Sequence, residues 1–102
     1  MEIEGEEMDE FVFRLSKFFE VLGNAVRFKI LLLLKEGPCT VGGLAEEIGR
    51  STQAISRQLK VLRDHQLVRS KTRGIYRDYY LKREDLIDAA TELYSLLTRA
   101  ER

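Results

Sequence analysis

The stretch over residues 51–65 constrains the fold of this chain more than any other part of its sequence. Its apolar residues Ile55, Leu59 and Leu62 stand at positions i, i+4 and i+7, the spacing of one face of an α-helix. Ser51 comes just before the first turn, where a side-chain oxygen caps a helix well. We therefore expect a helix whose apolar back lies in a core. Its other faces carry polar and basic side chains, namely Thr52, Gln53, Ser56, Arg57 and Lys60.

The polar face of this helix has two interpretations. Gln, Ser, Arg and Lys side chains suit base edges and phosphates in the major groove of DNA, but ordinary surface helices have a similar composition. The preceding residues favour the first interpretation. Thr40 is placed to cap a short helix over 41–48, and Gly49-Arg50 forms a tight turn into 51–65. Two helices joined by a short turn with glycine form a helix-turn-helix.

The segment before this pair of helices is expected to form the buried centre of the domain. Asn24 is a favoured N-cap for a helix over 25–36, which is apolar nearly all round in its second half. Gly37-Pro38 then stops that helix, because glycine fits the position after a helix end and proline cannot continue the helix.

A β-hairpin is predicted after the helix-turn-helix. Residues 67–70 form its first strand, 71–74 a basic turn and 75–81 a second strand with three tyrosines that suit a half-buried sheet. Arg73 and Arg77 near the tip favour a hairpin that touches DNA as a wing. The alternative is a hairpin that only covers the core.

Two terminal helices are expected, over about 9–22 and 84–100. Both carry apolar residues at helical spacing, among them Phe11, Leu15, Phe18, Leu93 and Leu97. These faces are wider than one small core needs, so we expect a homodimer through the terminal helices. The alternative is that both helices pack only on their own domain. The acidic residues 1–8 are expected to be disordered, and residues 9–102 to form the domain.

Charge is unevenly distributed along a chain with a formal net charge of zero. Residues 1–10 hold six acids and no base, whereas residues 50–77 hold eight Lys or Arg and a single acid. A local basic zone is what contacts phosphates, whatever the overall charge. The position of this zone on the polar helix and the hairpin therefore favours double-stranded DNA as a partner.

The predicted order of elements, α-α-α-α-β-β-α, is that of a winged helix-turn-helix, a mostly α-helical fold with a small hairpin. Over residues 15–97 the sequence resembles the ArsR/SmtB family of dimeric bacterial and archaeal repressors. The resemblance rests on LGNAVRFKILLLL at 22–34, VGGLAEEIGRSTQAISRQLKVLRDHQLV at 41–68 and RGIYRDYYL at 73–81.

The resemblance implies a homodimeric repressor that binds an inverted-repeat operator. It implies that the DNA-binding residues are Thr40, Ser51, Thr52, Gln53, Ser56, Arg57, Lys60, Arg73 and Arg77. A winged-helix protein-interaction module without specific DNA binding is the alternative. Ile75 follows the wing glycine where many members carry Arg, so this wing departs from the family pattern.

The resemblance does not extend to metal sensing. The cysteine positions of the metal-sensing members fall on Thr40 and Gly42, and Cys39 is one residue out of register. Soft metals need two or more thiolates or imidazoles, so we expect no metal and no other cofactor. Cys39 is then either a redox switch or a small packing residue, and we favour the packing role.

Several other classes of protein are disfavoured by the composition. No pair of nucleophile and base, phosphate loop or metal cluster indicates an enzyme. No apolar run approaches the ~20 residues that span a bilayer, and the acidic start lacks a signal pattern. We therefore expect a cytoplasmic protein without a membrane partner. The sequence identifies no effector.

Overall fold

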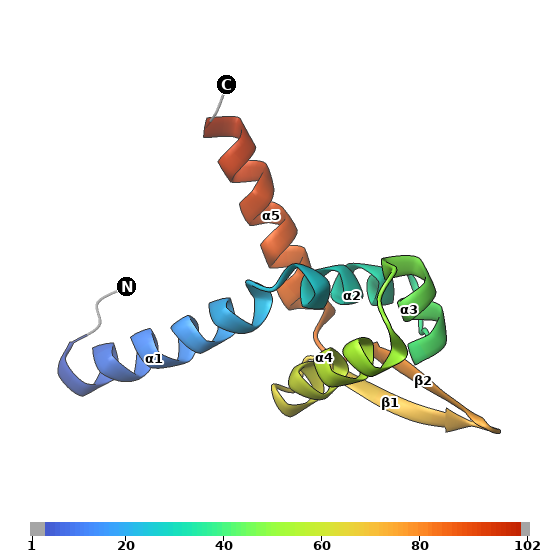
Figure 1. Ribbon diagram of the computed structural model, residues 1–102. Coiled ribbons are helices and arrows are strands. Elements are labelled where there is room, and N and C mark those ends of the chain that lie inside the picture. Colours follow the sequence, from blue (N-terminus) through green and yellow to red (C-terminus); the bar gives the residue numbers. More distant parts are fainter. Residues whose placement is uncertain (1–3, 101–102) are drawn as a thin grey trace.

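The computed structural model describes residues 4–100 (Figure 1). Its elements follow the predicted order α-α-α-α-β-β-α of a winged helix-turn-helix. Their bounds are α1 Gly5–Leu22, α2 Ala25–Glu36, α3 Val41–Ile48, α4 Thr52–Asp64, β1 Val68–Arg73, β2 Tyr76–Leu81 and α5 Glu84–Ala100. No helix in this part of the chain is long and apolar enough to cross a membrane.

The first helix begins at Gly5, earlier than the predicted start near Asp9. Residues 5–8, which were expected to be disordered, are therefore helical, while residues 1–3 lie outside the described part of the chain. Glu6 and Glu7 occupy the first turn, where carboxylates are stabilised by the positive end of the helix dipole. The predicted start was therefore too late, because carboxylates in the first turn favour a helix even where no apolar stripe marks it.

The core is centred on α2, as its apolar composition predicted. Ile30, Leu31 and Leu34 of this helix are buried. Buried side chains from the other elements close around them, namely Val21, Leu44, Ala45, Ile55, Leu59, Leu62, Leu67, Val68 and Ile87. The helix-turn-helix is therefore fixed to the domain by the apolar face of each of its helices.

The three predicted N-caps are confirmed by their hydrogen bonds. Asn24 Oδ1 accepts from the amide of Arg27 at 3.0 Å. Thr40 Oγ1 accepts from the amide of Gly43 at 3.1 Å, and Ser51 Oγ from the amide of Ala54 at 3.1 Å. Each cap satisfies an amide that the first turn of a helix leaves free.

The hairpin has a longer first strand and a tighter turn than predicted. β1 and β2 pair antiparallel from Val68–Leu81 to Arg73–Tyr76, which leaves only Gly74 and Ile75 in the turn. Gly74 has a φ of +61°, a value that glycine adopts easily at the first position of a two-residue hairpin loop. The basic residues assigned to the turn therefore continue the strand.

The terminal helices project from this body in different directions (Figure 1). α5 packs on α2 near its start, where Ile87 is fully buried, and its later turns extend away from the core. Much of the apolar surface of both helices is consequently exposed, including Phe11, Leu93 and Leu97.

Candidate nucleic-acid interface

The polar face of α4 is presented to solvent on a firmly anchored helix. Ile55, Leu59 and Leu62 are at most 1% exposed, so the back of the helix is held by the core. The residues assigned to DNA are all exposed on the other faces: Thr52, Gln53, Ser56, Arg57 and Lys60. The predicted division of this helix into a buried apolar face and an exposed polar face is therefore confirmed, while its contacts with DNA stay a prediction.

The basic side chains of α4 differ in their local partners. Lys60 forms an ion pair with Asp64 at 3.0 Å, one turn further along the helix. Arg57 is exposed and forms no ion pair with a carboxylate among residues 4–100. Arg57 is therefore the guanidinium on this face that a base or phosphate can engage without first displacing a carboxylate.

Thr40 and Ser51 act first as helix caps. Their hydroxyl oxygens accept from Gly43 and Ala54, so each oxygen is committed to its own helix. The hydroxyl hydrogens remain as donors, and the helix N-terminus beside each one favours an anion. Both residues can thus donate to a phosphate while they cap.

The two predicted wing arginines are engaged within the hairpin. Arg73 donates from Nε and Nη2 to the carboxylate of Asp78, at 2.7 and 3.2 Å, and lies 5.3 Å from the ring centre of Tyr76. This bidentate pairing lowers the pKa of Asp78 below its ordinary range, so the carboxylate is ionised at neutral pH. Arg77 donates to Ser70 Oγ at 3.1 Å. The wing is therefore less cationic than its Lys and Arg content indicates.

Three residues that support the interface were not singled out from the sequence. Arg27 at the start of α2 donates to the carbonyls of Val21 and Glu20 and to Gln58 Oε1 of α4, the last at 2.8 Å. It thus ties α4 to the corner between α1 and α2. Gln58 is 31 positions away in the sequence, so no local pattern indicates this contact. Asp78 comes near Arg73 only in the observed hairpin register, which differs from the register that a four-residue turn gives.

Cys39 lies at the edge of the hairpin. Its backbone exchanges two hydrogen bonds with Tyr79, at 3.0 and 2.8 Å. Burial raises the pKa of its thiol, and the carboxylates of Glu36, Glu47 and Asp78 raise it further. A thiol with a raised pKa forms little thiolate, the reactive species, so this setting favours the packing role over a redox switch.

In residues 4–100 no group of three or more His, Cys, Asp or Glu side chains is arranged to hold a metal ion. The face of α4, the two capped helix starts and the hairpin carry the polar and basic side chains of the site. Side chains of this kind on a helix-turn-helix with a wing define a DNA-binding winged-helix protein.

Comparison with known proteins identifies the family. The model of the bacterial regulatory proteins of the arsR family matches residues 24–70. The HTH-type transcriptional regulator Rv2034 of Mycobacterium tuberculosis is 35% identical over 83% of this chain and 79% of its own length. The chain belongs to the ArsR family and is a DNA-binding transcriptional regulator.

Two further relatives extend the comparison over most of the chain. The transcriptional repressor SdpR of Bacillus subtilis is 26% identical over 85% of this chain and 97% of its own. The solution structure of the homodimeric winged helix-turn-helix domain Mb0332 of Mycobacterium bovis has a TM-score of 0.76 and 22% identity. That match covers 99% of this chain and 93% of the Mb0332 domain. At this identity, the likeness to Mb0332 concerns the fold alone.

Proposed function

We propose that this protein is a homodimeric repressor that binds an inverted-repeat operator through the exposed face of α4. The observation that carries the proposal is the position of Gln53, Ser56 and Arg57 on a helix whose back is buried. In the major groove, Arg pairs with guanine and Gln with adenine, while Ser serves either base. The description of SdpR as a repressor supports the same role for this chain. Such a protein acts in the cytoplasm, where the DNA of bacteria and archaea lies.

Phosphate contacts come from residues around this reading surface. We assign them to Thr40, Ser51, Thr52, Lys60, Arg73 and Arg77. Lys60 and Arg73 each exchange an intramolecular carboxylate for a phosphate when DNA binds. The exchange costs little at Lys60, because its pair with Asp64 is exposed on both sides. It costs more at Arg73, because the side chain of Asp78 is only 22% exposed and accepts two hydrogen bonds.

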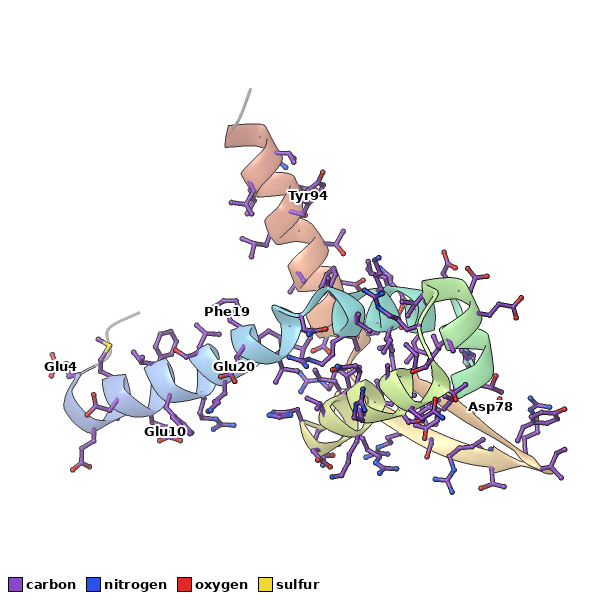
Figure 2. All side chains as sticks on the ribbon, in the orientation of Figure 1. Glu4, Glu10, Phe19, Glu20, Asp78 and Tyr94 are labelled. Atoms are coloured by element: carbon purple, nitrogen blue, oxygen red, sulfur yellow. The ribbon has the colours of Figure 1, made fainter. Side chains whose placement is uncertain are left out.

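The apolar faces of the terminal helices support the dimer. α1 and α5 line an open apolar groove of about 430 Å³, which Leu15 and Phe18 enter from α1 and Leu93 and Leu97 from α5. Phe19, labelled in Figure 2, lies on the side of α1 that faces α5. Phe11 continues this surface towards the start of α1, where it lines a second hollow. Apolar surface of this extent is covered by a second subunit in stable proteins.

A two-fold dimer determines the form of the operator. Two copies of α4 related by the axis enter successive major grooves on one side of the duplex, roughly 34 Å apart. The operator is accordingly an inverted repeat with half-site centres about 10 bp apart.

The proposal is tested by fluorescence anisotropy with genomic fragments that include the protein's own promoter, over a series of salt concentrations. We expect selective binding with a steep salt dependence, because phosphate contacts release counterions. Weak binding without sequence preference and without salt dependence would instead favour the protein-interaction module.

A further inference from the structure

A third hollow lies beside α1 and shares Phe18 and Leu86 with the apolar groove between α1 and α5, which we call the dimer groove. It has a volume of about 580 Å³ and is enclosed by α1, the end of α4 and the start of α5. Its apolar floor consists of Phe18, Val21, Leu67 and Leu86. Phe13 stands at its edge with 63% of its surface exposed, off the stripe assigned to the dimer. We call this hollow the basic groove.

Basic side chains from three parts of the chain line the basic groove, and the three that carry the positive charge are Arg14, Lys17 and Arg83. Arg14 and Lys17 come from α1, His65 from the end of α4 and Arg83 from the start of α5. Among the described residues none that lines it is acidic. His65 donates from Nδ1 to the carbonyl of Val61 at 2.9 Å, so Nε2 is the ring nitrogen that can contact a ligand. The groove therefore combines an apolar floor with a rim of positive charge.

The carboxylates that pair with these cations stand outside the groove. Glu10 lies 3.6 Å from Arg14, and Glu20 lies 3.6 Å from Lys17. Asp85 accepts from Arg83 at 2.8 Å. All three pairs are exposed, so solvent screens them and an incoming anion can compete for the cations. Lys17 also lies 5.9 Å from the ring centre of Phe13, so charge and aromatic surface are adjacent.

We propose that the basic groove binds a small organic anion with an apolar body. The apolar part of such a ligand covers Phe13 and the floor, while its carboxylate, sulfonate or phosphate meets the cations of the rim. Charge-assisted hydrogen bonds of this type are the strong ones. Pockets of a few hundred Å³ with apolar walls and a few convergent polar groups are typical of small-molecule sites. The proposal is independent of the DNA-binding function.

The test uses the full chain and two fluorescent probes of similar shape. The anionic probe is 8-anilinonaphthalene-1-sulfonate, and the neutral one is N-phenyl-1-naphthylamine, which has the same aromatic body without the sulfonate. We expect the double variant Lys17→Gln, Arg83→Gln to bind the anionic probe about tenfold more weakly, with the neutral probe little affected. Phe13→Ala should weaken both probes. Lys29→Gln, which removes an exposed cation of α2, is the matched control and should change neither.

Two results would overturn the proposal. The first is an unchanged affinity for the anionic probe in the double variant, with a loss instead in Leu97→Ser, since the probe would then occupy the dimer groove. The second is a double variant that binds the probe normally but self-associates more weakly, since a second copy of the chain would then cover the basic groove. Because the altered side chains are exposed, all variants should retain their helical circular dichroism, which is measured alongside.

Discussion

Arg73 of β1 and Asp78 of β2 form a bidentate ion pair next to the tip of the hairpin, with donor–acceptor distances of 2.7 and 3.2 Å. The pair places a carboxylate within the segment that we expect to meet phosphates. Asp78 lowers the positive charge of the wing and holds the guanidinium of Arg73 against β2. The pair therefore limits how strongly the wing attracts DNA irrespective of sequence.

Replacement of Asp78 by Asn should strengthen DNA binding through the wing. In the wild type, the carboxylate released when Arg73 meets a phosphate can take up a cation, which offsets part of the counterion release. The variant removes this offset and the cost of breaking the pair, so affinity should rise and the slope of log affinity against log salt should steepen by up to about one. Fluorescence anisotropy over a salt series measures this slope. Asp88→Asn is the matched control, because it removes one negative charge from a pair with Lys35 that joins α5 to α2. An equal effect of both variants would show that only net charge matters.

Arg57→Ala should weaken binding to the operator by about 1–3 kcal/mol, the range for loss of a bidentate base contact. Arg57→Lys keeps the charge but loses the planar fork, so it should retain the salt slope and lose base discrimination. Competition titrations with operator duplexes altered one base pair at a time separate the two effects. If Arg57→Ala binds the operator like the wild type, Arg57 does not contact the operator.

Leu93→Glu should dissociate the dimer, because it places a carboxylate in the apolar groove between α1 and α5. Analytical ultracentrifugation measures the shift towards monomer. Ile75→Glu is the control, since Ile75 is an equally apolar residue that is 93% exposed at the hairpin turn. A sedimentation coefficient that is the same for both variants and the wild type would exclude α5 from the interface.

Cys39 should react slowly with thiol reagents at neutral pH. Its raised pKa keeps the thiol protonated, and the fraction of reactive thiolate is correspondingly small. The rate with 5,5′-dithiobis(2-nitrobenzoate), compared with the rate after unfolding in urea, checks this. Operator affinity should be equal with and without reductant. Loss of binding on oxidation that reductant restores would assign Cys39 a sensing role.

Most of the fold follows from local patterns in the sequence. The starts of α2, α3 and α4 were predicted from their caps Asn24, Thr40 and Ser51, because a cap depends only on the next few residues. The apolar spacing of Ile55, Leu59 and Leu62 likewise gave the buried back of α4. Two boundaries were misplaced, at the start of α1 and at the hairpin turn, where favourable charge and strand pairing extend the elements.

Contacts that depend on how the helices pack and how the strands pair could not be predicted from local sequence patterns. Arg27 meets Gln58 only because the core brings α2 and α4 together, and neither residue belongs to a motif. The ion pair of Arg73 with Asp78 depends on the register of the hairpin, which the predicted four-residue turn had shifted. A count of charges therefore overestimated the cationic character of the wing.

The most direct test of the account is the effect of half-site spacing on operator affinity. Once a selective promoter fragment is found, the wild-type protein is titrated by anisotropy against that operator and against the same operator with five base pairs inserted at its centre. The insertion turns one half-site to the opposite side of the duplex, about half a helical turn. The account predicts that affinity falls to that of a single half-site. Unchanged affinity would contradict a rigid homodimer that reads both half-sites through α4.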